Sequence, residues 1–491
     1  MVEEIQRFLS GQRSDDGGSM SLNYRKLAGD ALVAFFAQGV SMLLSAMTSI
    51  LVPKIMGVES FGYWQLFMFY TSYVGLFHLG INDGVYLEQG GVQRHRINKK
   101  VISSELKFSL LYQLIFSAVL VVFGFCCFKD SSRSFVIIAT AIFLLLNNLS
   151  NFLGFLFQAM NETKRYSISV LVDRFIFLVP LTIFLLSHCG DFKLYIIAYA
   201  CSKTCCLLYC VYEARDIVFV KMLPLSQACQ RSIESIRVGI KLTIANISSM
   251  LIVGIARALV DMFWGIVDFG QVSFSLSLVT FFLTFVSQAS LVLFPALRSI
   301  NRDELVHFYS AIKQFMSYFF PFAYALYFPI AWIMRLWLPQ YNVAISYLAI
   351  LMPICVFDTK MDICCTTYMK VLRMEKQLLV VNLSCVAISG LCCYVAARFV
   401  FSINAVLVVA VMVVVGRSLF SEALVNRHLG QRFETMAIIE LIVSVLFVLL
   451  SFAPFAIFIT GVMLSLIIYG IYYRNIGVKI YTSIRKHVLR R

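Results

Sequence analysis

The chain has 491 residues, of which 60% are hydrophobic and 14% are charged, whereas soluble proteins carry about 25% charged residues. Its mean hydropathy is +0.84 and its formal net charge is +15. This composition excludes a soluble enzyme and a disordered chain, because both need a far more polar sequence. A nucleic-acid-binding surface is not expected either, since so apolar a chain has few places for a basic patch.

Apolar stretches long enough to cross a bilayer recur along the whole chain, since a spanning helix needs about 20 residues. We predict an all-α polytopic membrane protein with about fourteen transmembrane helices. The predicted spans are 29–53, 63–87, 105–128, 135–158, 168–188, 194–213, 239–261, 271–295, 314–336, 343–362, 377–400, 403–424, 436–457 and 458–474. The longest connection, 214–238, is too short for an independent domain. The polar first 20 residues predict no cleavable signal peptide.

The cations are distributed unequally between the two sides of the predicted membrane. When the connections alternate, 31 of the 41 lysines and arginines fall on one side and six on the other. Because cytoplasmic loops are enriched in lysine and arginine, both termini are predicted to lie in the cytoplasm. Lys360, which counts among the 31, clusters with Asp358 and Asp362 and is expected to be solvated or paired. The remaining four cations fall within spans: Arg174, Lys203, Arg257 and Arg417.

The chain also contains an internal repeat. Residues 57–62 match residues 265–270 at an offset of 208, and the same offset aligns 37–43 with 245–251. The offset covers six spans, so both copies have one orientation, which is typical of a transporter with two lobes and a site between them. The predicted organisation is a cytoplasmic tail at 1–28, a first lobe at 29–213, a cytoplasmic linker at 214–238, a second lobe at 239–424, two further spans at 425–474 and a basic cytoplasmic tail at 475–491.

Charged residues inside a membrane are costly and commonly functional, so the cations within spans are candidates for a substrate-binding cavity. Asn246 and Arg257, eleven residues apart, share a helix face. Gln38 belongs to the equivalent polar stripe of the first copy. Arg174 and Lys203 lie in the fifth and sixth spans.

Structural alternatives stay open for each of these cations. Arg257 has Asp261 at i+4 and could form a local ion pair with it. Arg174 follows Asp173 directly, and neighbouring helix positions diverge, so one of the two should find a partner on another helix. Arg174 and Lys203 could therefore form interhelical structural pairs, and a structural pair is the favoured interpretation for Arg417, which has Glu422 nearby.

No metal or catalytic site is predicted. Four cysteines at 201, 205, 206 and 210 lie in an apolar helix without a histidine or carboxylate partner. Nucleotide-binding loops and nucleophile motifs are absent from the sequence, so an ATPase is not expected. Asp83 follows His78 and Asn82 near a span end; it could couple transport to a cation, although a solvated helix end is favoured.

The stretch 51–64, LVPKIMGVESFGYW, followed by LGINDG at 79–84, resembles the amino-terminal signature of Wzx-type polysaccharide flippases. These belong to the superfamily that also contains multidrug extruders and lipid II flippases. The stretch 261–270 looks like its second-lobe counterpart, with Gln271 where a tyrosine often follows. The resemblance covers the whole chain through span count, topology and repeat.

This resemblance implies a flippase that moves an undecaprenyl-diphosphate-linked oligosaccharide, for O-antigen or a related surface polysaccharide, across the bacterial inner membrane. The cations Arg174, Lys203 and Arg257 would offset the desolvation of the diphosphate. The resemblance implies energisation by a proton or sodium gradient, with coupling candidates Asp83, Asp173 and Asp261, and no cofactor. The expected partners are membrane lipids, a polysaccharide polymerase and the chain-length machinery, and no nucleic acid.

Three other functions compete with this interpretation. A multidrug antiporter of the same superfamily would need buried carboxylates for cationic drugs, but the charges in mid-span are mainly positive. A membrane-embedded polymerase or glycosyltransferase would need a large extracytoplasmic loop for its chemistry, and the connections are short. A purely structural scaffold would not need cations within its spans.

Overall fold

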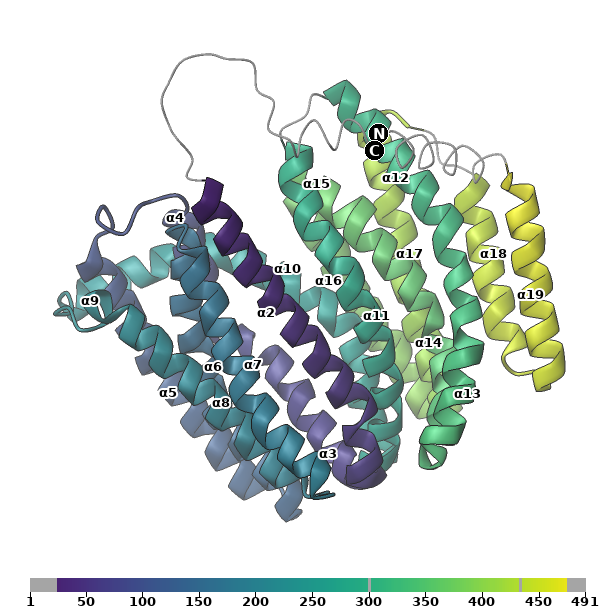
Figure 1. The fold of residues 1–491 in the computed structure, drawn as a ribbon, viewed down its shortest axis with the longest axis horizontal. Helices are drawn as coiled ribbons and strands as arrows, with labels where there is room; N and C mark the ends of the chain where they lie inside the picture. Colours follow the sequence, from purple (N-terminus) through teal and green to yellow (C-terminus); the bar gives the residue numbers. More distant parts are fainter. Residues whose placement is uncertain (1–23, 299–301, 432–434, 475–491) are drawn as a thin grey trace. The chain divides into compact units, whose positions relative to one another are not determined.

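The structure, a computed structural model, describes residues 24–298, 302–431 and 435–474, and its regular elements there are all helical (Figure 1). A chain in hydrocarbon must satisfy its backbone hydrogen bonds internally, which a helix achieves within one segment. The elements are α2 (Tyr24–Ile50), α3 (Val52–Tyr73), η1 (Val74–His78), α4 (Ile81–Glu88), α5 (Lys99–Cys127), α6 (Ser131–Ala159), α7 (Thr163–Leu186), α8 (Phe192–Glu213), α9 (Arg215–Val218), α10 (Leu225–Trp264), α11 (Ile266–Arg298), α12 (Arg302–Phe319), η2 (Phe320–Leu326), α13 (Tyr327–Trp337), η3 (Pro339–Tyr341), α14 (Asn342–Lys360), η4 (Met361–Thr366), α15 (Thr367–Val371), α16 (Glu375–Val395), η5 (Ala396–Val400), α17 (Ile403–Leu429), α18 (Thr435–Leu450) and α19 (Phe455–Tyr472).

The predicted fold class, an all-α polytopic membrane protein, is confirmed. Among the described residues, eleven helices or continuous helical runs are long and apolar enough to cross a membrane. A bent pair, 36–50 with 52–78, makes a twelfth if it forms one span, and 436–450 is a shorter apolar helix. The total of fourteen spans stays a prediction.

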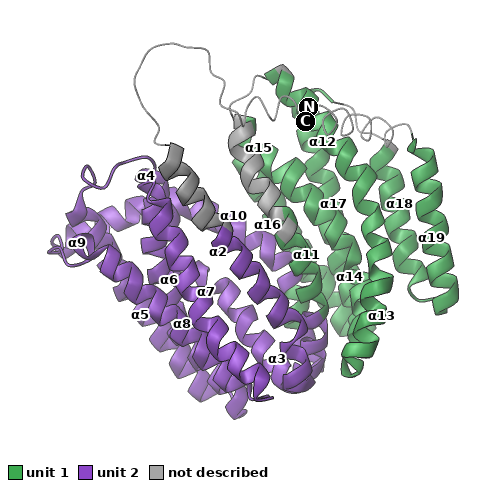
Figure 2. Ribbon diagram, in the orientation of Figure 1, with its two compact units in different colours: residues 1–21, 255–259, 275–491 green, residues 22–254, 260–274 purple. Residues whose placement is uncertain are grey.

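The chain divides into two compact units (Figure 2). One, here called the first unit, comprises residues 22–254 and 260–274; the second unit comprises 255–259 and the described residues from 275 to 474. Helix α10 therefore contributes residues to both units. The predicted lobe boundaries at 213 and 239 stay a prediction.

Polar residues cap the long helices where the chain re-enters the apolar region. The side chains of Asn98, Asp130 and Asp191 accept hydrogen bonds from the first-turn amides of α5, α6 and α8, and Ser402 caps α17 in the same way. Each cap satisfies an amide that the helix itself leaves without a partner.

The two copies of the internal repeat share a backbone conformation. Gly57 and Gly265, which are equivalent at the offset of 208, both have positive φ, at 73° and 89°, with ψ near 180°. Their partners Gly62 and Gly270 lie against each other, because a Cβ built on Gly270 would lie 3.0 Å from the Cα of Gly62. The repeated glycines thus provide one turn in each copy and a close backbone contact between the two copies.

The loops that connect the helices of the first unit lie alternately at its two ends, as the sequence predicts. Arg94, between α4 and α5, pairs with Glu162 at 2.8 Å and with Asp216 at 2.5 Å, which joins it to the connections after α6 and α8. The hydrogen bond from Arg94, with Lys99 nearby, holds the pKa of Asp216 well below its ordinary range. At the other end, Asp130 accepts a hydrogen bond from Tyr63 at 2.8 Å.

Candidate functional site

The fifth and sixth predicted spans, α7 and α8, bring three of the predicted site residues together. Asp173 on α7 lies 3.3 Å from the Nζ of Lys203 and accepts a hydrogen bond of 3.3 Å from Ser202, both on α8. The side chains of Lys203 and Asp173 are only 13% and 8% exposed. The interhelical pair that the sequence left open for Lys203 is therefore present, and its substrate contact stays a prediction.

We call Asp173, Arg174, Ser202 and Lys203 the α7–α8 cluster. Arg174 gives this cluster a net positive charge. Its guanidinium is within electrostatic range of Asp173 and of the Tyr199 hydroxyl on α8, and its buried Nε has no hydrogen-bond partner among the described residues. Asp173 offsets one of the two cations, so Arg174 and Lys203 together leave one positive charge uncompensated inside the helical bundle. Such a group can bind an anion that brings its own oxygen acceptors.

Aromatic rings adjoin the α7–α8 cluster and hold its helices together. Tyr199 stacks on Phe143 with ring centroids 5.3 Å apart and makes edge contacts with Trp64, Phe67 and Phe177. Rings in these geometries stabilise the packing beyond the apolar area that they bury.

The other predicted substrate residues lie on α2 and α10. Gln38 is half-buried on α2, which packs along α7. Asn246 is exposed on α10 and Arg257 is half-buried further along the same helix. Their roles in substrate binding stay predictions.

Asp261, predicted as the local partner of Arg257 or a coupling carboxylate, forms a two-pronged pair with Arg133. The two distances are 2.7 and 2.8 Å, and they link the start of α6 to the end of α10. Planar carboxylate and guanidinium groups favour this geometry. Asp261 therefore belongs to an ion pair that connects two helix ends, and the sequence did not indicate this pair.

The interpretation of Asp83 as a solvated helix end is wrong. Asp83 is 9% exposed and accepts a hydrogen bond from Thr243 of α10. The covering helix can approach because Gly80 and Gly84 flank Asp83, and a Cβ on either glycine would collide with α10. Burial by a distant helix through glycine contacts is not visible in the local sequence.

A second charged cluster, which the sequence did not indicate, lies inside the second unit. Lys360 contacts Glu440 at 2.7 Å and Glu422 at 3.2 Å, and Lys313 lies 3.6 Å from Glu422. All four side chains are at most 3% exposed. The four charges balance, as burial requires, and they connect α12, α14, α17 and α18.

Lys313 and Lys360 both belong to the 31 cations on the predicted cytoplasmic side. Lys360 is expected to be solvated or paired, and the pairing is confirmed, because both glutamates contact it. Arg417 pairs with Asp358, as expected for a structural arginine. One residue in the sequence could have indicated the buried cluster. Glu440 is a lone carboxylate in the apolar stretch 436–450, where it needs a partner of opposite charge.

Neither family models nor curated proteins match this sequence. Solved structures share its fold. The lipid II flippase MurJ in an inward closed conformation has a TM-score of 0.60 at 12% identity, covering 91% of this chain and 99% of that chain. An inward-facing multidrug resistance MATE family transporter of the MOP superfamily has a TM-score of 0.58 at 12% identity, covering 82% and 98%. The chain therefore has the fold found in MOP-superfamily transporters such as MATE proteins and in the MurJ flippase.

Proposed function

We propose that this protein is a flippase for undecaprenyl-diphosphate-linked oligosaccharide, which it moves from the cytoplasmic to the periplasmic leaflet by alternating access. The fold supports a transporter, since it is shared over nearly the whole length of a lipid II flippase. The Wzx-type signature at 51–64 and 79–84 supports a polysaccharide substrate.

The observation that carries the proposal is the cationic excess of the α7–α8 cluster. Lys203 contacts one carboxylate, Asp173, and Arg174 lies within electrostatic range of the same carboxylate in the predicted spans. A diphosphate head group would lose its hydration in the bundle, and charge-assisted hydrogen bonds from a guanidinium offset part of that cost. An anionic substrate therefore suits this cluster better than a cationic one does.

A multidrug antiporter is the second candidate, and the buried carboxylates of the second unit are the observation that favours it. Glu422 and Glu440 are deeply buried, as a site for a cationic drug would require. Both, however, contact Lys360, so they are already compensated. For this reason we prefer the flippase.

The first test follows lipid-linked repeat units in cells that lack the protein. We expect the repeat units to accumulate on the cytoplasmic face, where they stay protected from probes added outside. Normal translocation with failed polymerisation would contradict a flippase and favour a polymerase. Loss of drug resistance with normal translocation would favour the antiporter.

The second test removes the cation of the cluster. Arg174→Gln should lower translocation at least tenfold while membrane insertion stays normal, since a lost charge-assisted hydrogen bond corresponds to about 1.5–3 kcal/mol. Lys193→Gln is the matched control, because it removes one cation from the start of α8, where Lys193 lies over the Phe135 ring. Equal transport by both variants would mean that the cluster does not bind substrate.

A further inference from the structure

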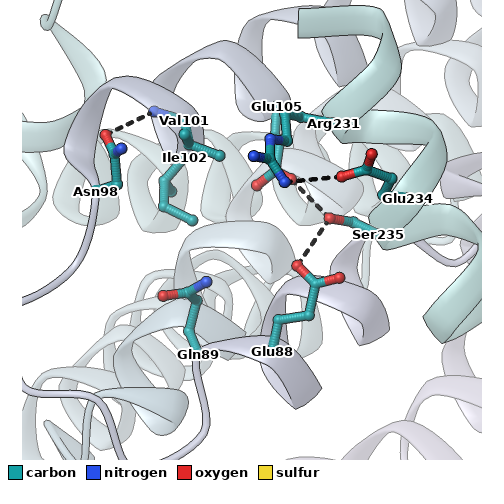
Figure 3. A pocket seen from close by; sticks show the side chains of 9 residues that line it. All are labelled: Glu88, Gln89, Asn98, Val101, Ile102, Glu105, Arg231, Glu234 and Ser235. Carbon is teal, nitrogen blue, oxygen red and sulfur yellow. Dashed lines mark hydrogen bonds and ion pairs between the residues drawn. The ribbon is translucent and has the colours of Figure 1, made fainter. Parts of the chain in front are cut away.

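A pocket of about 330 Å³ opens in the first unit where α4, α5 and the start of α10 meet (Figure 3). Its polar lining comes mainly from Glu88 of α4, Glu105 of α5, and Arg231, Glu234 and Ser235 of α10. None of these residues was singled out as a site from the sequence, and the α7–α8 cluster does not include them.

Glu105 is the buried carboxyl group of this pocket. It is 2% exposed, and its Oε1 lies 2.6 Å from the Oγ of Ser235, which is itself 1% exposed. Its Oε2 is buried and has no hydrogen-bond partner among the residues that the structure describes. An ionised carboxylate with a bare oxygen in such a place would be very costly, whereas a neutral carboxyl with one bare oxygen costs about 1–3 kcal/mol.

Ser235 contacts two carboxyl groups at once. Its Oγ lies 2.6 Å from Glu105 and 3.1 Å from Oε2 of Glu88 (Figure 3). A serine hydroxyl has one proton to donate and can accept from a second group. Both contacts are hydrogen bonds only if one of the two carboxyl groups also carries a proton.

We infer that Glu105 is a proton-binding site, connected to the surface through Ser235 and Glu88. Glu105 donates from Oε1 to Ser235, and Ser235 donates to Glu88, which is exposed. To release the proton, Glu105 passes it to the Ser235 oxygen while the original hydroxyl proton of Ser235 moves to Glu88. Glu88 then gives that proton to water, and the net result is one proton moved from Glu105 to solvent.

The other charges that face Glu105 fit this assignment. Arg231 and Glu234, both on α10, pair with each other at 2.9 Å and thereby compensate one another. Glu88 on α4 is a second carboxyl group that contacts the same serine, so it adds no positive charge. The pocket therefore leaves Glu105 without a dedicated cation.

Protonation of Glu105 would affect how α10 packs on α4 and α5. With Glu105 protonated, Ser235 bridges the two helices by hydrogen bonds. After the proton leaves, two carboxylates face each other across one hydroxyl and repel. A role for this proton in transport rests on the proposed function, because a flippase that works against a gradient needs a source of energy.

Infrared difference spectroscopy of the purified full-length protein tests the assignment without any transport measurement. The wild type at neutral pH should show a carboxylic-acid C=O band that is lost in Glu105→Gln. The matched variants Glu88→Gln and Glu234→Gln should retain it. Retention of the band in Glu105→Gln, or its loss in Glu88→Gln alone, would overturn the assignment.

Ser235→Ala tests the path and keeps both carboxyl groups in place. After transfer to D₂O, the deuterium shift of the Glu105 band should be slower in this variant than in the wild type. An unchanged exchange rate would show that the proton does not pass through Ser235.

A final measurement separates a proton from a metal cation. The band should be the same in sodium chloride and in choline chloride at one pH. Its loss in sodium alone would show that the pocket binds sodium in place of the proton and would overturn the inference. A failed band test with normal flipping would leave the proposed function intact.

Discussion

At the scale of single residues, the most consequential feature is the compensation of buried charges. Lys360 is 1% exposed and forms ion pairs with two glutamates, Glu422 and Glu440, that lie on different helices. Neither glutamate could stay ionised at this depth without a cation, since uncompensated burial costs several kcal/mol. The position of Lys360 is therefore a condition for the packing of α14, α17 and α18.

We expect Lys360→Met to lower the free energy of unfolding by about 3–5 kcal/mol, because it leaves two buried carboxylates with less positive charge. Thermal unfolding in detergent measures this loss. The double variant Lys360→Met with Glu440→Gln should recover part of it, since it restores the balance of charge.

Arg231→Met is the control for this prediction. Arg231 is 60% exposed and pairs with Glu234, so its loss should change stability by at most about 1 kcal/mol. If Lys360→Met were no more harmful than Arg231→Met, the buried cluster would not stabilise the second unit.

At the scale of helices, glycines set how closely the elements of the first unit pack. A Cβ on Gly239 of α10 would collide with the carbonyl oxygen of Gly80 and the amide of Gly84, at the start of α4. These contacts are between backbones, and small residues permit such an approach between membrane helices. The hydrogen bond from Thr243 to Asp83 lies beside this crossing.

Gly239→Ala should destabilise the protein by about 1–3 kcal/mol, because the added methyl group forces two backbones apart. Thermal unfolding of the purified variant measures the change. Gly416→Ala, in the middle of α17 where a Cβ meets nothing within 4 Å, should be neutral or stabilising by up to about 1 kcal/mol. Similar losses in both variants would show that the crossing is not tight.

At the scale of the whole molecule, the excess of cations on one predicted side determines the expected orientation. Lys313 and Lys360 belong to the buried cluster, and removing them from the 31 leaves the asymmetry almost unchanged. The ion pairs of Arg94 with Glu162 and Asp216 also gather three predicted cytoplasmic connections at one end of the first unit. The excess of cations alone predicts that these loops lie in the cytoplasm, and this location stays a prediction.

The orientation is tested with fluorescent protein fusions, because green fluorescent protein fluoresces in the bacterial cytoplasm and not after export through the general secretion pathway. A fusion at the carboxyl terminus should fluoresce, and a fusion truncated after Ala453, between α18 and α19, should not. The opposite pattern would reverse the orientation, and fluorescence from both would show that α19 does not span the membrane.

The sequence by itself determined the fold class and the repeat, because both depend on local patterns: apolar length gives helices, and matching glycines such as Gly57 and Gly265 give matching turns. It also placed Asp173 and Lys203 on neighbouring spans. Only the tertiary structure decided which charges meet, as for Glu440 with Lys360, and that Asp83 is buried under α10. These contacts join residues far apart in the chain, and their energies depend on burial that no local pattern encodes.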